Sequence, residues 1–355
     1  MKRILTITLA AAAALLSCNK NSSPLPDRGE TVLNVRISAG GTKASTASEN
    51  DEAKVNRIEV LVFNGSGALD AYKSSDGTGL KVEGISSSSG TKTVVAVVNA
   101  PSAAGISGVT DITGLRAITS TFKADNALDS FIMYGEKSVT LQPSGTNDVN
   151  VEVNRLAARI RIDKVKREFR PEMQGLVALP ADDFEIVRFY LTNVAGDTNY
   201  GAPVSAAANT TWLTDESLLQ SSAVSIDKDA KVYSPAKVDG GMNKLAQDGV
   251  YDNIHRLYAY PNASAAQITK LVVECLIDGN YYTFPIAFEG LQPNYSYEIR
   301  NLTITRLGHA SDGDDSIDTD EDVDPIQTVD FDCEITVNPW NLVLMGPSGD
   351  GNITI

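Results

Sequence analysis

The segment DVNVEVN, residues 148–154, decides the fold class, because valine alternates with polar residues along its whole length. Successive side chains of a β-strand point to opposite faces, so Val149, Val151 and Val153 share one face. The segment ARIRIDKV, residues 158–165, continues with the same period of two. Together the two segments predict consecutive strands, each with one apolar and one polar face.

Similar short segments recur along the rest of the chain, separated by clusters of Gly, Ser, Asn and Pro. They predict strands at 31–37, 57–63, 91–99, 184–192, 270–278, 281–288, 295–305 and 331–337. Helical periodicity is scarce, and the expected short helices are 111–122 and 214–221. GISSSSGTK, residues 84–92, is expected to be a hairpin connection. Many short strands joined by turn residues predict an all-β protein built from sandwiches or barrels.

The N-terminus carries the features of an export signal. Two basic residues in positions 1–3 precede an apolar run at 4–16, about 13 residues, which is too short to span a bilayer of ~30 Å as a helix. The residues at 15–18, Leu-Leu-Ser-Cys, resemble a bacterial lipobox, in which Cys18 becomes the lipid-bearing first residue of the mature chain. The alternative is an ordinary secretory signal that is cut near Ser17.

The composition excludes several function classes. A net charge of −15 argues against a nucleic-acid-binding protein, which needs a basic face. The motifs GxSxG, HExxH and GxGxxG are absent, and two histidines leave little material for acid–base or metal chemistry. We therefore expect no catalytic residues, no cofactor and no metal site. The acidic segment 311–325 is expected to be a solvated loop, because it lacks the glycine and distal glutamate that an EF-hand loop needs for Ca²⁺.

Two cysteines remain after Cys18, and each falls inside a predicted strand. Cys275 and Cys333 are either buried thiols or a disulfide between neighbouring strands, which an exported protein could form.

The chain divides into four parts. Residues 1–17 are the signal peptide, and the polar, proline-containing residues 18–30 are a flexible tether. The remaining length suits two domains, 31–154 and 155–355, because the strand pattern begins again after Asn154.

The two ends of the mature chain are unusual. The first strand, 31–37, is followed by a small, polar loop, 38–52, that a protease could reach, with Lys43 and Ala44 in its middle. At the other end, 333–355 is apolar almost to the last residue. Trp340, Leu342 and Leu344 alternate there, and Ile353 and Ile355 share one face. This is strand material that needs a partner, either in its own domain or in another molecule.

Several segments of the chain resemble those of a known family. The segments that carry the resemblance are 50–74, 90–100, 154–165, 291–305 and the ending with Cys333, Val337 and Trp340. They are similar to those of the FimA-like fimbrillins of Bacteroidales, the major subunits of type V pili, from the lipobox to the C-terminus.

The resemblance implies a fold and a maturation pathway. Family members have two transthyretin-like β-sandwich domains in tandem and few short helices. A lipoprotein signal peptidase would act before Cys18, and acyl chains such as palmitate on Cys18 would hold the precursor at the outer membrane. A trypsin-like surface protease of the gingipain kind would then cut between Lys43 and Ala44. Lysine replaces the family's arginine there, and the other basic candidates, Arg36 and Arg57, lie in or beside strands.

The resemblance also implies an assembly mechanism. After the cut, the first strand with Leu33, Val35 and Ile37 would leave, and the C-terminal strand of another copy would fill the groove. The donor strand is expected within 333–355, through Trp340, Leu342, Leu344, Ile353 and Ile355.

The expected function is that of a structural subunit, the shaft, of a surface fimbria that supports cell adhesion, and not of an enzyme. Its partners would be further copies of the chain in a head-to-tail fibre, together with anchor and tip subunits. The alternatives are an anchor or tip subunit, or a glycan-binding surface lipoprotein. A glycan site would need more aromatic residues than the 6% present here.

Overall fold

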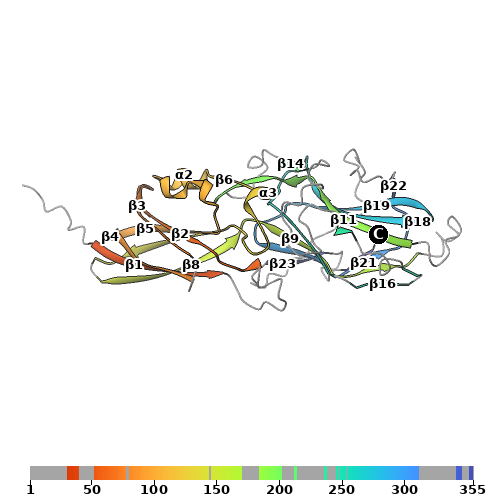
Figure 1. Cartoon of the computed structure of the whole chain (residues 1–355), viewed down its shortest axis with the longest axis horizontal. Helices are drawn as coiled ribbons and strands as arrows, with labels where there is room; N and C mark the ends of the chain where they lie inside the picture. Colours follow the sequence, from red (N-terminus) through yellow and green to blue (C-terminus); the bar gives the residue numbers. More distant parts are fainter. Residues whose placement is uncertain are drawn as a thin grey trace, which may run out of the picture.

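The structure is a computed structural model that describes residues 30–39, 52–76, 80–143, 145–169, 184–201, 212–213, 236–237, 245–246, 248–252, 254–311, 341–345 and 352–354. Strands dominate these residues, and the helices among them are short. The prediction of an all-β chain with few short helices is confirmed. Figure 1 shows an elongated molecule with one group of strands at each end.

The first group forms a seven-stranded sheet in the order β3-β2-β5-β7-β8-β1-β4. Its strands are β1 (Glu30–Ala39), β2 (Ile58–Asn64), β3 (Leu69–Ser75), β4 (Lys81–Ser88), β5 (Gly90–Val98), β7 (Met133–Leu141) and β8 (Thr146–Arg155). Strands β7 and β8 pair only where Met133 and Tyr134 meet Arg155 and Asn154. The sheet turns there, so that β3-β2-β5-β7 and β8-β1-β4 become two layers of a sandwich (Figure 1).

The core of this sandwich lies between the two layers. Alternate residues of β2 and β5, such as Val60 and Val94, pack against alternate residues of β1 and β8, such as Val35 and Val151. The strict alternation of residues 148–154 therefore places the valines of β8 in the core and the polar residues between them on the surface, as the sequence predicts.

Short helices cover the outer face of the β2–β5 layer. They are η2 (Ser102–Ala104), η3 (Ile106–Gly108), α2 (Ile112–Arg116) and α3 (Phe122–Asp125). Leu115 and Phe122 pack there against Leu61 and Phe63. The helix predicted over 111–122 is wrong in length, because α2 ends at Arg116 and strand β6 (Thr119–Thr121) follows.

The expected hairpin connection at 84–92 is also wrong. Gly84 to Ser88 belong to β4, and Gly90 to Lys92 belong to β5. The two strands lie in different layers and do not pair with each other. The run of serines misleads because β4 is an edge strand with one largely exposed face, so it needs few apolar residues.

The second group of strands forms two further layers. One layer combines the orders β17-β9-β20-β23 and β16-β10-β21-β24, and the other has the order β15-β11-β18-β19-β22. The bounds of the first layer are β9 (Ala158–Ile162), β10 (Val165–Arg167), β16 (Val250–Tyr251), β17 (His255–Ala259), β20 (Tyr295–Ile299), β21 (Asn301–Ile304), β23 (Asn341–Leu344) and β24 (Asn352–Thr354). Those of the second are β11 (Phe184–Thr192), β15 (Ala236–Lys237), β18 (Thr269–Ile277), β19 (Asn280–Phe288) and β22 (His309–Ser311).

The two groups share one strand order. In the first, β1 lies between β8, to which it is parallel, and β4, to which it is antiparallel. In the second, β9 lies between β20, to which it is parallel, and β17, to which it is antiparallel. Strand β9 thus takes the place that β1 takes in the first sandwich.

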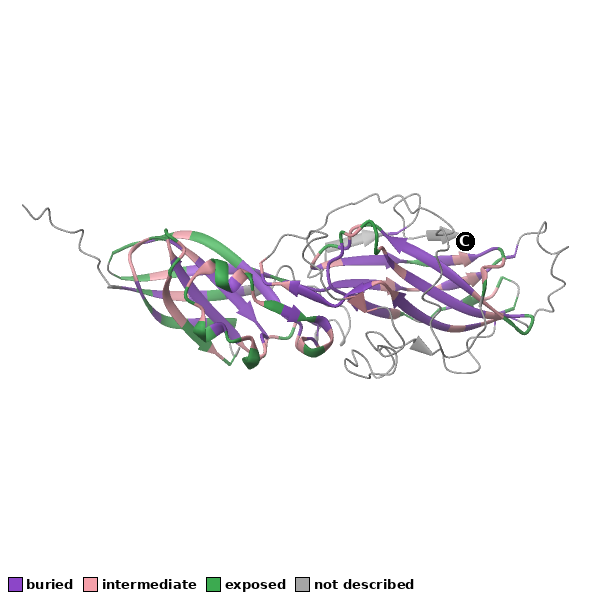
Figure 2. Cartoon of the chain, turned by 90° about the horizontal axis from the view of Figure 1, so that it is seen from above, coloured by how far each residue is buried: buried purple, intermediate pink, exposed green. Residues whose placement is uncertain are grey.

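The two halves join through paired strands and a shared core. Strand β6 of the first half pairs with β13 (Asp197–Asn199) of the second, and a two-stranded sheet of β12 (Val194–Ala195) and β14 (Trp212–Leu213) lies nearby in sequence. Ser120 and Asn126 both lie within hydrogen-bond distance of the buried Tyr260 hydroxyl. Figure 2 shows buried residues continuing from one half into the other.

Candidate functional site

The first strand is the central strand of its layer. It runs parallel to β8 from Val32 opposite Thr146 to Ala39 opposite Val153. It runs antiparallel to β4, with Arg36 opposite Lys81. Loss of β1 would therefore leave a slot between two strands, each with an unpaired backbone edge.

The apolar side chains of β1 fill the core of the sandwich. Leu33 and Val35 have 0% of their surface exposed and Ile37 has 4%, whereas Val32, just before them and on the other face, is 41% exposed. The three residues predicted to leave the groove with the first strand thus lie on one face, and that face is the buried one.

Thr31 adds a polar contact at one end of the slot. Its side chain is 1% exposed, and its hydroxyl donates to the Gly145 carbonyl at 3.3 Å and accepts from Asn147 Nδ2 at 2.6 Å. These bonds fix the start of β1 against the loop that precedes β8.

The β4 wall of the slot is held from its other side by a polar cluster around Asp70 of β3. Asp70 accepts hydrogen bonds from Ser87 Oγ at 2.6 Å, Ser88 N at 2.9 Å and Lys92 Nζ at 2.8 Å. Burial favours a higher pKa for Asp70, but the bonds from Lys92 and the two serines outweigh it and lower the pKa to about 2. Because these bonds do not involve β1, they would still fasten β4 in the absence of β1.

The C-terminal strands lie in the second half of the molecule, outside the sandwich that contains the slot. Strand β23 pairs in parallel with β20, and β24 pairs in parallel with β21. Both are edge strands, with one neighbour each among the described residues. Met345, the residue after β23, is fully buried, and its N–H donates to the Glu298 carbonyl at 2.8 Å. Strands β23 and β24 therefore pair within the second half of their own chain. The sequence left open whether they do this or pair with another molecule.

The segment between the predicted loop and β2 is anchored by a buried ionic cluster. Glu52 is fully buried, and Arg159 Nη1 of β9 donates to its Oε2 at 2.9 Å. The Tyr258 hydroxyl donates to the other carboxylate oxygen, and Arg155 Nε donates to the Glu52 carbonyl at 2.8 Å. Burial lowers the pKa of Arg155 to about 10 and raises that of Tyr258 well above its usual value, so Arg155 stays charged and Tyr258 neutral at pH 7.

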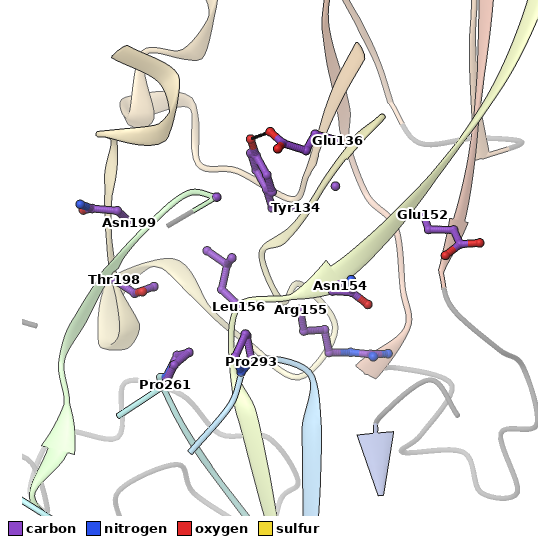
Figure 3. Close-up of a pocket in the computed structure, with 12 residues that line it drawn as sticks. Tyr134, Glu136, Glu152, Asn154, Arg155, Leu156, Thr198, Asn199, Pro261 and Pro293 are labelled. Atoms are coloured by element: carbon purple, nitrogen blue, oxygen red, sulfur yellow. Dashed lines mark hydrogen bonds between the residues drawn. The ribbon is translucent and has the colours of Figure 1, made fainter. Parts of the chain in front are cut away.

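A pocket of about 530 Å³ lies where the two halves meet (Figure 3). Tyr134 and Glu136 of β7 line it from the first half, and Thr198 and Asn199 from the second. The Tyr134 hydroxyl donates to Glu136 at 2.9 Å, and Arg116 Nη2 donates to both oxygens of that carboxylate at 2.8 Å. These bonds already occupy the carboxylate, and we assign the pocket no ligand.

In the described ranges, no group of three or more His, Cys, Asp or Glu could hold a metal ion. No helix in those ranges has the length and apolar character needed to cross a bilayer.

Comparison with known proteins shows which family part of the chain is similar to. Residues 31–164 match the family model described as major fimbrial subunit protein (FimA). Over 173 residues the chain is 27% identical to the major fimbrium subunit FimA type-2 of Porphyromonas gingivalis, and the match covers 44% of each chain. The resemblance to the FimA-like fimbrillins is confirmed. This family is one of structural fimbrial subunits and not of enzymes.

Solved structures extend the likeness of fold to most of the chain. A candidate cell adhesion protein of Bacteroides eggerthii has a TM-score of 0.58 at 18% identity, with 84% of this chain and 93% of that one covered. A fimbrilin (FimA) of Porphyromonas gingivalis has a TM-score of 0.53 at 16% identity, with 80% and 92% covered.

Several residues predicted to act in maturation and assembly lie outside the described part of the chain. They are Cys18, Lys43, Ala44, Trp340 and Ile355. Leu342, Leu344 and Ile353 fall in β23 and β24. The loop predicted at 38–52 is shorter than expected, because Ser38 and Ala39 belong to β1 and Glu52 is buried.

The two strand cysteines differ in what can be said of them. Cys275 lies in β18, as predicted, and is a free, fully buried thiol whose pKa is raised by burial. Cys333 lies outside the described residues.

The sequence did not point to Glu52 or Asp70. Glu52 and Arg159 are 107 positions apart, so only the tertiary structure brings them together. The residues next to Glu52 in the sequence are mostly polar, so they do not indicate that Glu52 is buried.

Proposed function

We propose that the chain is the precursor of a shaft subunit of a surface fimbria, and that the fimbria supports cell adhesion. The observation that carries the proposal is the position of β1, a buried central strand near the N-terminal end of the chain. A strand in this position can be removed by a single cut behind it, and its removal creates a binding groove. The match to the major fimbrial subunit family supports the same role.

Export and anchoring come first in the proposed pathway. A lipoprotein signal peptidase cuts before Cys18, and the acylated Cys18 holds the precursor at the outer membrane. Two or three acyl chains anchor a protein firmly, whereas one holds it only marginally. The tether, residues 18–30, then connects the lipid to β1, so the lipid and β1 leave together when the chain is cut.

The cut is proposed between Lys43 and Ala44. Before it, β1 is continuous with β2 through the intervening segment, and after it β1 is held only by non-covalent contacts. The far side of the cut stays in place, because Glu52 is bonded to Arg159 of β9 in the second half and to Arg155 at the end of β8. Asp70 and its partners still hold the β4 wall.

The C-terminal strand of a second copy then fills the slot. Its donor residues are Trp340, Leu342, Leu344, Ile353 and Ile355, on a segment whose strands β23 and β24 lie at sheet edges. Filling three such sites is worth about 1.5–3 kcal/mol each as an upper bound, and the open edges regain backbone hydrogen bonds.

The geometry favours a fibre over a closed pair. The slot lies in the first half and β23 in the second, so each subunit accepts with one half and donates from the other (Figure 1). Such a contact is heterologous, and repeating it extends a chain of subunits. Other subunits of the fimbria, an anchor and a tip, would end it.

Limited trypsin digestion of the purified precursor tests the proposal. We expect a first cut after Lys43, loss of the fragment that carries β1, and slow polymerisation. Lys43→Ala should block the cut and the polymer, and Lys43→Arg, the matched control, should preserve both. Mass-spectrometric reading of subunits from sheared filaments should find an N-terminus at Ala44. An N-terminus at Cys18 would instead identify an anchor, and cut precursor that stays monomeric would refute strand exchange.

A further inference from the structure

Asn34 of β1 occupies a special position in the slot. The pairing of β1 with β4 shifts its register between Leu33 and Val35, and Gly84 of β4 lies beside this irregularity with a φ of +67°. The Gly84 N–H donates to Asn34 Oδ1 at 3.1 Å, and Asn34 Nδ2 donates to Asp148 Oδ1 of β8 at 3.1 Å. One side chain therefore bridges both walls of the slot, and it does so by accepting from one wall and donating to the other.

The two groups that bond the Asn34 side chain, the Gly84 N–H and the Asp148 carboxylate, are part of the walls. They would therefore still need an amide partner in the absence of β1. A left-handed φ suits glycine, so the irregularity in β4 is fixed by the residue at position 84. Lys73 Nζ donates to the Gly84 carbonyl at 3.1 Å and holds this point from the β3 side. A strand that enters the slot thus meets three apolar sites, left by Leu33, Val35 and Ile37, and one amide site between the first two.

The C-terminal segment has this pattern. Residues 33–37 read Leu-Asn-Val-Arg-Ile, and residues 340–344 read Trp-Asn-Leu-Val-Leu. Both have apolar residues at the first, third and fifth positions and asparagine at the second. We propose that 340–344 of a second copy enters the slot parallel to β8, with Asn341 in the place of Asn34, so that Asn341 determines register and direction. This inference rests on the strand exchange proposed above.

The direction follows from the place of the asparagine. If the donor ran antiparallel to β8 with its apolar residues in the same three sites, Val343 would meet Asp148 and the Gly84 N–H. Valine can neither accept nor donate, and both wall groups would lose their partner. Only the parallel orientation brings Asn341 to them. Strand β23 already runs parallel to β20, the counterpart of β8 in the second sandwich.

Two other segments have part of the pattern. Residues 352–355 read Asn-Ile-Thr-Ile, but Gly351 would leave the Leu33 site empty. Residues 301–304 read Asn-Leu-Thr-Ile, but Arg300 would meet that apolar site, and β21 is already paired on both edges, by β10 and β24. The segment 340–344 alone among the three fills every site.

Disulfide trapping tests the register. In the precursor Arg36 pairs with Lys81 of β4, and both side chains are exposed. In the proposed register residue 343 takes the place of Arg36. Lys81→Cys combined with Val343→Cys should therefore give polymers that run as a covalent ladder on non-reducing gels. Peptide mapping would separate this bond from any formed by the native cysteines.

The alternative registers predict different ladders. A ladder from Lys81→Cys with Asn341→Cys would show the antiparallel donor, and one with Thr354→Cys would show 352–355 in the slot. Either result would overturn the proposed register while strand exchange itself stands. If cut wild-type precursor forms no polymer at all, the proposed function fails and this register fails with it.

Kinetics give a second test that does not depend on cysteines. Asn341→Ala removes both amide bonds, and we expect elongation to slow by about tenfold. Asn352→Ala is the matched control at the other asparagine, and its rate should stay within about twofold of wild type. The melting temperature of each precursor would show that β23 and β24 remain seated before the cut. Equal elongation rates for the two variants would overturn the role of Asn341.

Discussion

Leu33→Ala should release the first strand after cleavage much faster than wild type. Leu33 is completely buried between the two layers of the first sandwich. Replacing such a leucine by alanine typically costs about 2–5 kcal/mol, the lost transfer energy plus a cavity term. Since about 1.4 kcal/mol is a factor of ten, the cut strand should dissociate at least about thirtyfold faster. Val32→Ala is the control, because Val32 neighbours Leu33 but is 41% exposed.

The assay follows the fragment directly. Each precursor is cut with trypsin, and the amount of first-strand peptide that co-elutes with the subunit is measured by mass spectrometry over time. Polymer growth is followed in parallel by light scattering. Because the proposed mature subunit lacks the peptide, filaments from all three proteins should have the same thermal stability once formed.

Two results would contradict this reasoning. If Leu33→Ala and Val32→Ala release the peptide at the same rate, burial in the core does not hold β1 in place. If filaments from Leu33→Ala differ in stability from wild type, the first strand remains in the fibre, and the exchange mechanism is wrong.

Three further predictions concern residues that would remain in the subunit after the first strand has left. Glu52→Gln removes a fully buried carboxylate from its arginine partner, and it should lower the free energy of unfolding by about 2–4 kcal/mol in urea denaturation. Lys54→Gln, the control at an exposed ion pair, should change this free energy by less than about 1 kcal/mol. The pKa of Asp70 lies below its unfolded value, so its stabilisation is complete above pH ~4 and is lost as the pH falls towards 2. Asp70→Asn should therefore be less stable than wild type at pH 7, by about 1–2 kcal/mol, and the difference should vanish near pH 2. Cys275 should resist iodoacetamide in the folded precursor and react after unfolding, as peptide mapping would show, because burial raises the pKa of its thiol.

The sequence predicts best those strands whose two faces differ in polarity. The strand predicted at 184–192 has the same bounds as β11, and the alternation of 148–154 lies inside β8. The sequence gives no such signal for β3, β4 and β7, in which half-buried or exposed residues are frequent. In β4 the irregularity at Gly84 also breaks the period of two, so Val82 and Ile85 are buried three positions apart.

The candidate site divides in the same way. Alternation in the sequence was enough to identify Leu33, Val35 and Ile37 as one face. The role of Asn34 depends on Gly84 and Asp148, which are 50 and 114 positions away, and no local pattern reports such contacts. Apolar sites can thus be predicted from periodicity. Polar contacts between strands can be identified only when the tertiary structure places the strands side by side.

Although the two sandwiches share one strand order, the proposed cut would open a groove in the first sandwich only. Strand β9 has the place in the second sandwich that β1 has in the first, but it follows β8 after a turn of two residues, and Arg159 fastens it to Glu52 and to Ser296 of β20. Strand β1 has no buried ion pair among its described side chains, and Arg36, one of its two charged residues, is exposed. A cut in the loop behind β1 would therefore free a strand held by apolar packing, backbone bonds and the hydrogen bonds of Thr31 and Asn34, which a donor of the same pattern can replace. The same ionic cluster that secures β9 also secures Glu52, so the new N-terminal segment and the second sandwich would stay fixed while the first strand is exchanged.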